Sequence, residues 1–175
     1  MLVNNAGQAA SMPFLRTDAA ALNAMLGVNF HGTWLVTQAV LPDMLKRKVG
    51  RVINVASTAG LTGYPYVTAY VAAKHAVVGL TRALALEVAK QGVTVNSVCP
   101  GFTETPLLDG AIANITGKTG RSDDAARTDL ARPNPMGRFV QPHEVANAVA
   151  WLASPGATSI NGQCIAVSGG EVMTG

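Results

Sequence analysis

The apolar residues follow two alternating patterns along the chain: short continuous runs, and longer segments in which an apolar residue recurs every three or four positions. The short runs are rich in β-branched residues, which is typical of strands buried on both faces of a sheet. The longer segments have the period of helices that pack one face against a core. The predicted strands are Met1–Asn4, Arg51–Ala56, Val93–Val98 and Gln163–Val167, and the predicted helices are Ala19–Lys48, interrupted by Asn29 and Pro42, Ala69–Gln91, which stops at Gly92, and 143–153 after Pro142.

The order of these segments predicts the fold class. Strands alternate with helices, which favours a parallel sheet with helices on both faces. Such a layer is a doubly wound, Rossmann-like α/β fold, and it binds its ligands at the carboxyl ends of the strands. The length of 175 residues suits one domain.

The segment from about 102 to 140 interrupts this order. Its apolar periodicity fades, and polar residues, Gly and Pro accumulate. A long, weakly patterned segment in a compact domain is usually functional. We therefore expect it to be irregular and to form a lid over the substrate.

Composition narrows the possible partners. Hydrophobic residues make up 49% of the chain and charged residues 13%, which is too apolar for a disordered protein. No apolar run approaches the ~20 residues that span a bilayer, and we find no signal peptide, so we expect no membrane partner and a cytoplasmic location. The net charge of +3 is too small, and aromatic residues too sparse, to favour nucleic-acid binding.

The Cys and His residues give no metal pattern. Cys99 and Cys164 both lie in predicted strands, where a buried free thiol is the expected state. His31, His75 and His143 share no ligand spacing. We therefore expect no metal site.

Three residues form a candidate reaction centre. Ser57 directly follows the strand that ends at Ala56, and Tyr70 and Lys74 are four residues apart in a predicted helix, so they share a face. A lysine ammonium beside a tyrosine would lower the phenol pKa from its usual value near ~10. The tyrosine could then act as a general acid or base, while a serine hydroxyl could bind the developing oxyanion. Spacing alone favours the simpler interpretation, a surface Tyr–Lys pair and a strand-end serine.

The surrounding motifs favour the catalytic interpretation. Together they resemble, in order and spacing, the short-chain dehydrogenase/reductase family over essentially the whole chain. The matching segments are Asn4–Gly7 (NNAG), Val28–Gly32 (VNFHG), Asn54–Gly60 (NVASTAG), Tyr70–Lys74 (YVAAK), Pro100–Thr105 (PGFTET), and Gly137–Phe139 with Pro142–Ala146.

The resemblance implies roles for individual residues. Tyr70 would be the catalytic acid/base, Lys74 would lower its pKa and bind the nicotinamide ribose, and Ser57 would polarise the carbonyl. Asn29 would kink its helix and hold a water, whereas Asn4 would tie the sheet together. The family usually has Ile or Val where this chain has Thr103. The implied cofactor-binding residues are Asn5, Ala6, Gly7, Tyr70, Lys74, Pro100, Gly101, Thr103 and Thr105.

One family motif is not found in the sequence. The glycine-rich TGxxxGxG loop, which binds the cofactor pyrophosphate at a helix N-terminus, has no match. The only similar stretch, Gly117–Gly120, lies in the expected lid and lacks a preceding strand. The resemblance therefore implies a partial Rossmann-like domain over residues 1–175 that keeps strands 4 to 7 of the family's sheet. The cofactor would be NAD or NADP, with a slight preference for NADP.

The function implied by the resemblance is the NAD(P)-dependent interconversion of a carbonyl and a secondary alcohol. The chain is most similar to reductases of 3-oxoacyl thioesters on acyl-carrier protein or CoA. Hydroxysteroid or other secondary-alcohol dehydrogenases share its motifs, and a truncated, non-catalytic fragment is a further alternative. Besides a small-molecule or acyl-thioester substrate, the expected partner is a second copy of the chain, in a homodimer or homotetramer.

Overall fold

A single parallel sheet organises the structure, a computed structural model that describes residues 1–173. Its four strands lie in the order β1-β2-β3-β4 with every pair parallel, and Val52 of β2 lies between Leu2 of β1 and Val95 of β3. The predicted α/β, Rossmann-like parallel sheet is confirmed. The strands are β1 Leu2–Asn4, β2 Gly50–Val55, β3 Val93–Pro100 and β4 Cys164–Val167.

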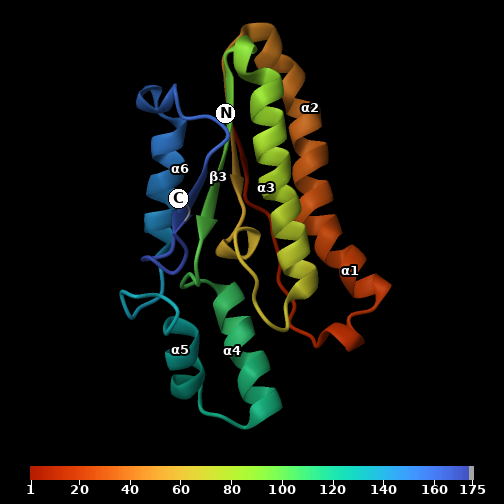
Figure 1. Cartoon of the computed structure of the whole chain (residues 1–175), viewed down its shortest axis with the longest axis vertical. Coiled ribbons are helices and arrows are strands. Elements are labelled where there is room, and N and C mark those ends of the chain that lie inside the picture. The colour runs from red at the N-terminus through yellow and green to blue at the C-terminus, as the bar shows by residue number, and fades with distance from the viewer. Residues whose placement is uncertain (174–175) are drawn as a thin grey trace.

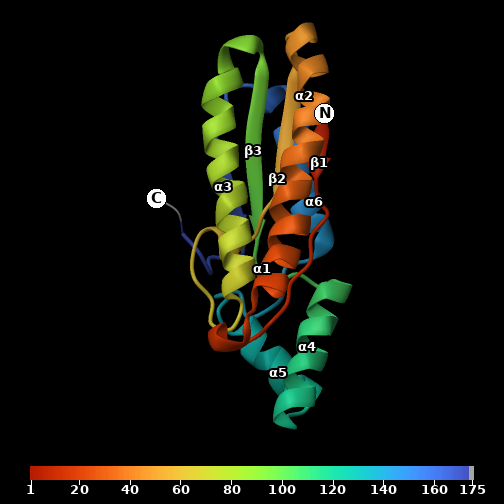
Figure 2. The same cartoon turned by 90° about the vertical axis from the view of Figure 1, so that its right-hand side faces the viewer.

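Helices cover both faces of this sheet. In Figure 1 the helices α2 and α3 lie on one side of β3 and α6 lies on the other, and Figure 2 shows α2 and α3 side by side in front of the strands. The helices are α1 Ala19–Leu26, α2 Gly32–Arg47, α3 Thr68–Val88, α4 Pro106–Thr119, α5 Asp123–Ala131 and α6 Pro142–Ala153.

The continuous apolar runs bury both faces of the strands because successive side chains point to opposite sides. Val52 packs with Met44 and Val95 in the core beneath α2 and α3. Its neighbour Ile53 packs with Leu152 in the core beneath α6. Each run therefore serves two cores, which is why its hydrophobicity does not alternate.

The predicted helix Ala19–Lys48 is divided in the structure. It consists of α1, a π-helical turn Gly27–His31 that contains Asn29, and α2. The expected interruption at Asn29 is thus confirmed, whereas Pro42 is accommodated inside α2 without ending it. The predicted helix Ala69–Gln91 is confirmed as α3 followed by a short 3-10 turn, and it stops at Gly92 with φ 72°.

The expectation of an irregular segment from 102 to 140 is wrong, because this segment contains α4 and α5. Local signals explain both helices. Pro106 occupies the first turn of α4, and Gly120 ends it with φ 68°. The Ser122 side chain caps α5 by accepting from the Ala125 N–H at 3.3 Å. These helices, which we call the α4–α5 arm (residues 106–131), project beyond the carboxyl ends of the strands (Figure 1).

Residues 1–173 bear on two kinds of partner, a membrane and a metal ion. Within this part of the chain no helix is both long and apolar enough to cross a membrane. The same residues contain no group of three or more His, Cys, Asp or Glu side chains arranged to hold a metal ion.

Candidate functional site

The sequence-predicted residues converge where the parallel strands end. Asn5–Gly7 follow β1, Ser57 follows β2, Gly101–Thr105 follow β3, and Tyr70 and Lys74 lie in the first two turns of α3. The structure therefore brings these four predicted sets of residues to one edge of the sheet, where the carboxyl ends of its parallel strands lie.

Ser57 is held by a short turn. Its hydroxyl accepts a hydrogen bond from the Ala59 N–H at 3.1 Å and so begins the 3-10 turn Thr58–Gly60. Gly60 packs directly on α3, because a Cβ added there would lie 2.8 Å from the Lys74 carbonyl oxygen. A side chain at position 60 would therefore push the Ser57 turn away from the helix that carries Tyr70 and Lys74.

Lys74 is buried against the end of β2. Only 4% of its surface is exposed, and its ammonium donates a hydrogen bond to the Val55 carbonyl oxygen at 3.0 Å. Burial lowers the pKa of Lys74 to about 8, and the nearby Cys99 thiol opposes this shift. Lys74 is thus a buried cation at the reaction edge with one backbone partner.

The expected lowering of the Tyr70 pKa is not what the structure gives. Burial raises the pKa of Tyr70, and a hydrogen bond with Ser57 only partly opposes that rise. The reason is geometric: the Lys74 Nζ lies over the tyrosine ring, 5.6 Å from its centroid, and binds the Val55 carbonyl. The buried phenol therefore keeps its proton at neutral pH.

Asn29 lies in the π-helical turn and is 1% exposed. Its Nδ2 donates to the Met25 carbonyl at 3.0 Å and to the Gln8 carbonyl at 2.9 Å, and its Oδ1 accepts from the Gln8 N–H at 3.3 Å. The widened turn frees backbone groups that a side chain can satisfy. Asn29 thereby ties the segment after β1 to the helix pair α1 and α2.

Gly7 provides a space beside this amide. A Cβ added to Gly7 would lie 3.0 Å from the Asn29 Oδ1 and 3.5 Å from the Lys74 Nζ. Asn5 and Ala6 are exposed. The segment after β1 therefore lies close to Lys74 at Gly7, and its residues Asn5 to Gly7 are exposed to solvent.

The segment after β3 satisfies its hydroxyl groups locally. The Thr103 Oγ1 donates to the Gly101 carbonyl at 2.9 Å, and the Thr105 Oγ1 donates to the Thr103 carbonyl at 3.2 Å. The Gly101 N–H donates to the Val167 carbonyl at 3.0 Å, which joins the end of β3 to β4. Pro100 is the last residue of β3. These contacts fix the backbone rather than present the hydroxyls to a ligand.

Behind the site, hydrogen bonds between buried polar side chains join β1 and β2 to the helices α2 and α3. The Asn4 Nδ2 donates to Thr37 in α2 at 2.9 Å and to the Asn54 Oδ1 at 2.8 Å, and the Asn54 Nδ2 donates to Thr81 in α3 at 2.9 Å. The prediction that Asn4 ties the sheet together is consistent with these contacts. We call these four residues the polar ladder.

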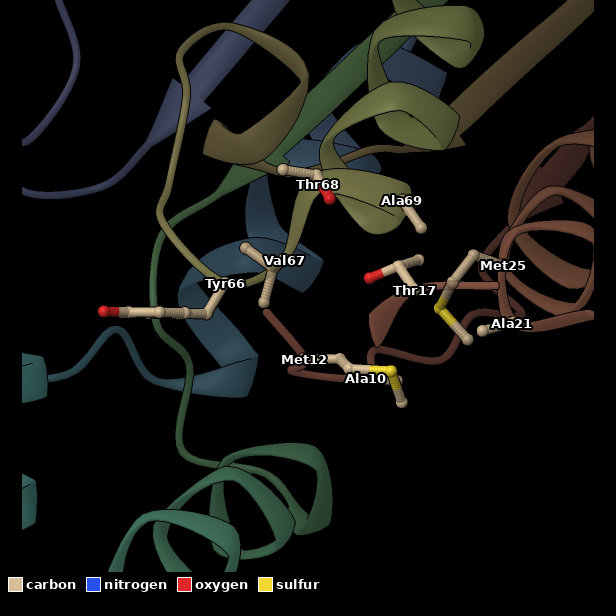
Figure 3. Close-up of a pocket in the computed structure, with 9 residues that line it drawn as sticks. All are labelled: Ala10, Met12, Thr17, Ala21, Met25, Tyr66, Val67, Thr68 and Ala69. Carbon is tan, nitrogen blue, oxygen red and sulfur yellow. The ribbon is translucent and has the colours of Figure 1, made fainter. Parts of the chain in front are cut away.

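Two hollows in the structure lie away from the reaction centre. An apolar hollow of about 370 Å³ lies between the ends of β1 and β2 and helix α6, and Asn5 is one of its lining residues. A much smaller pocket of about 20 Å³ lies between α1 and the start of α3 (Figure 3). It has space for about one water. Ser57, Tyr70 and Lys74 line neither hollow.

Sequence patterns did not identify two side chains at this edge. The Tyr64 phenol lies 2.5 Å from a carboxylate oxygen of Glu171 and 2.9 Å from the Thr58 hydroxyl. Tyr64 lies in the loop between the Ser57 turn and α3, and Glu171 lies beyond β4. Neither belongs to a periodic segment, so only the folded arrangement reveals their proximity.

The two cysteines lie on the neighbouring strands β3 and β4, and Cys99 acts on Lys74. Both are free, Cys99 buried and Cys164 partly exposed. The Cys99 thiol donates a hydrogen bond to the Cys164 sulfur, and this bond together with burial raises the pKa of Cys99, while the same bond lowers the pKa of Cys164 to about 7. The expected free thiols are thus confirmed, although Cys164 is less buried than expected.

Comparisons with known proteins agree on one family. The profile of the family described as "Enoyl-(Acyl carrier protein) reductase" matches residues 1–171. The 3-oxoacyl-[acyl-carrier-protein] reductase FabG of Thermotoga maritima is 37% identical over 173 residues, which cover 99% of this chain and 66% of that protein. In length, this chain spans about two thirds of such relatives.

Solved structures share the fold. A variant of actinorhodin polyketide ketoreductase crystallised with NADPH is 40% identical and superposes with a TM-score of 0.92, covering 97% of this chain and 66% of that one. A 4-hydroxyisoleucine dehydrogenase mutant complexed with NADH and succinate is 27% identical with a TM-score of 0.86, covering 98% and 67%. The two neighbours thus carry different nicotinamide cofactors.

Proposed function

Because the chain belongs to the short-chain dehydrogenase/reductase family, we propose that the full-length protein is an NAD(P)-dependent oxidoreductase that interconverts a carbonyl and a secondary alcohol. The observation that carries this proposal is the placement of Ser57, Tyr70 and Lys74 at one edge of the sheet, with Lys74 bound to the end of β2 at 3.0 Å.

Tyr70 acts as the proton donor in the reducing direction. Its raised pKa keeps the phenol protonated at neutral pH, and protonation of the substrate oxygen completes the alcohol. Ser57, which hydrogen-bonds to Tyr70, positions the carbonyl and stabilises the charge that develops on its oxygen. In the oxidising direction the same phenol must first lose its proton, and a bound cofactor's positive charge would favour that loss.

The residues at the edge suit a nicotinamide cofactor, which when bound supplies or accepts the hydride. An ammonium has three donors; the structure gives the Lys74 Nζ one acceptor among the described residues, the Val55 carbonyl. Its other N–H groups are available for ribose hydroxyls. The absence of a Cβ at Gly7 leaves room beside it. We assign the cofactor-binding roles to Asn5, Ala6, Gly7, Tyr70, Lys74, Pro100, Gly101, Thr103 and Thr105, and the catalytic roles to Asn29, Ser57, Tyr70 and Lys74.

A 3-oxoacyl thioester is the proposed substrate class, and NADPH is the slightly favoured cofactor. Support comes from the relative named as a 3-oxoacyl-[acyl-carrier-protein] reductase and from the ketoreductase solved with NADPH. The proposed lid of about 102–140, which contains the α4–α5 arm, includes an apolar cluster of Leu108, Ile112 and Phe139.

The position of the chain in the family's sheet is part of the proposal. We assign β1 to β4 to strands 4 to 7 of that sheet, so residues 1–175 are one part of a single catalytic domain. The coverage of 66% of the relatives supports this assignment. It puts the glycine-rich phosphate loop before β1 in the family's order. Exposed Trp34 and Leu35 of α2, with Leu86 of α3, support pairing of these helices in a homodimer or homotetramer.

The experiment is a turnover assay with the full-length protein. Oxidation of NADPH and of NADH is followed with a 3-oxoacyl thioester, and reduction of the oxidised cofactors is followed with secondary alcohols and hydroxysteroids. We expect Tyr70→Phe to lower kcat by at least ~100-fold while cofactor affinity stays within a few-fold. Tyr66→Phe, which removes an exposed phenol from the loop that precedes α3, is the matched control and should retain full activity. No turnover by the wild type, or more than about a tenth of it in Tyr70→Phe, would contradict the proposal.

A further inference from the structure

Three side chains from separate parts of the chain meet beside the Ser57 turn. Thr58 begins that turn, Tyr64 belongs to the loop 61–67, and Glu171 follows β4. The Tyr64 phenol oxygen lies 2.9 Å from the Thr58 Oγ1 and 2.5 Å from the Glu171 Oε1. Thr58 is 3% exposed, and Tyr64 and Glu171 are half-buried.

The direction of these hydrogen bonds follows from the inventory of donors. A carboxylate can only accept, and a phenol has a single proton. The Tyr64 O–H therefore donates to Glu171, and the Thr58 hydroxyl donates to the Tyr64 oxygen. Burial raises the pKa of Tyr64, and the hydrogen bond to Glu171 raises it further. Tyr64 consequently stays protonated, and its O–H donates to the Glu171 carboxylate.

The same three residues connect segments that form the walls of the site. The Tyr64 ring packs edge-on against Phe102, with 6.3 Å between ring centroids. The Glu171 carboxylate approaches the backbone after β3 so closely that a Cβ on Gly101 would lie 2.6 Å from its Oε2. The contacts thus join the Ser57 turn, the loop 61–67 and the segment after β3.

We propose that Glu171 and Tyr64 are positioning residues, an inference that rests on the proposed function. They hold the Ser57 turn against the segment after β3, in the position that catalysis requires. Glu171 orients Tyr64, Tyr64 accepts from Thr58, and Thr58 is the first residue of the turn that Ser57 caps. A displacement of a polarising group by about 1 Å can cost up to ~100-fold in rate. Because this contact acts through two intermediate residues, a smaller loss is expected.

Kinetics of four variants of the full-length protein test the contact. Glu171→Ala and Tyr64→Phe should each lower kcat about tenfold, with the KM for the cofactor within about twofold of the wild type. Glu171→Gln keeps an acceptor oxygen, so it should retain at least about half of kcat. The double variant Glu171→Ala/Tyr64→Phe should be no slower than the singles, because both remove the same contact. Tyr66→Phe serves as the control and should leave kcat unchanged.

A second readout does not depend on turnover. Nuclear magnetic resonance of protein labelled at the tyrosine Cζ follows the ionisation of Tyr64, which Tyr64→Phe assigns. Glu171 and Tyr70 are the titratable groups that act on Tyr64. In Glu171→Ala the Tyr64 pKa should fall, and the amide signal of Ala59, whose N–H binds Ser57, should shift.

The outcomes separate the two proposals. If the wild type shows no turnover, the proposed function fails, while the Tyr64 titration and the Ala59 signal still decide whether Glu171 positions the turn. Unchanged Tyr64 titration and unchanged Ala59 signal in Glu171→Ala would overturn the positioning role. It would also be overturned if both single variants kept kcat within about twofold, or if their effects multiplied in the double variant.

Discussion

The body of the molecule, which is the sheet β1–β4 with α1, α2, α3 and α6, differs from the α4–α5 arm in the kind of polar contact that stabilises it. In the body, the polar ladder joins α2, β1, β2 and α3 through buried amides and hydroxyls at 2.8–2.9 Å. In the arm, Arg121 pairs with Asp129 at 2.7 Å, and Arg127 pairs with Glu104, with all four side chains 36–44% exposed. Buried hydrogen bonds enforce one geometry because an unmade bond is costly, whereas exposed ion pairs contribute little.

This difference agrees with the roles that we propose for the two regions, catalysis for the body and a lid for the arm. Ser57, Tyr70 and Lys74 lie on the body, where the ladder and the packed Gly60 fix the distances between elements. The two helices of the arm pack chiefly on each other and share an apolar cluster with Phe102 and Phe139, and the Lys118 ammonium donates an exposed hydrogen bond to the Ser11 carbonyl at 3.3 Å. A rigid body suits proton transfer, which depends on geometry at the scale of a hydrogen bond. A more loosely held arm suits a lid that must admit substrate.

The first prediction compares two buried asparagines, Asn54 in the polar ladder and Asn134 in the loop that joins the arm to α6, and carries the largest expected effect. Asn54→Ala should lower the free energy of unfolding by about 3 kcal/mol, because it leaves a void and removes the partners of Asn4 and Thr81. Asn134→Ala removes bonds to Met136 and Arg138, which are local in sequence, and should cost about 1 kcal/mol. Urea unfolding of the two variants is the measurement. Equal losses would show that the ladder is no more important than a loop contact.

The sequence predicted the body better than the arm, for identifiable physical reasons. The strand runs, the stop at Gly92 and the interruption at Asn29 all follow from local backbone and burial preferences, and the structure contains each of them. The arm was expected to be irregular although Pro106, Gly120 and Ser122 mark the ends of its helices, because its short apolar periods were too weak to register.

The site divides in the same way. Motif spacing placed Ser57, Tyr70 and Lys74 correctly at the edge of the sheet. The sign of the Tyr70 pKa shift could not be predicted from spacing, since it depends on how deeply the fold buries the phenol and on where the Lys74 ammonium points. The contact between Tyr64 and Glu171 joins residues 107 positions apart, so no local sequence pattern indicates it.

The second prediction tests how rigidly the body buries Lys74. In the folded protein burial lowers the pKa of Lys74 to about 8, from a usual value of 10.5 that applies to the unfolded chain. Between these values the unfolded state binds more protons, so the free energy of unfolding rises with pH; below about pH 8 both states are charged and the cost of burial is fully present. We expect this contribution to rise by about 2 kcal/mol between about pH 8 and pH 10 without cofactor.

The variant Lys74→Met isolates that contribution. Cys99, Cys164, Tyr64 and Tyr70 also have shifted pKa values in the folded protein and so make the free energy of unfolding depend on pH. Their contributions largely cancel when the variant's pH profile is subtracted from that of the wild type. Urea unfolding at a series of pH values gives both profiles. A flat difference would mean that water reaches the Lys74 ammonium and that the body is looser than its contacts indicate.

The smallest expected effect concerns the base of the arm. Arg127 of α5 pairs with Glu104, which directly precedes the arm, and its guanidinium lies over the Phe139 ring at 5.2 Å. Because both charged side chains are more than a third exposed, Arg127→Met should lower the global free energy of unfolding by less than about 1 kcal/mol. Met retains much of the apolar contact with Phe139, so the variant removes mainly the charge. The local consequence should be larger than the global one: amide hydrogen exchange should quicken throughout α4 and α5 and stay unchanged in α3 and β3. Exchange that quickened equally in α3 would show that the arm and the body open together, and the contrast between a rigid body and a loosely held arm would then be wrong.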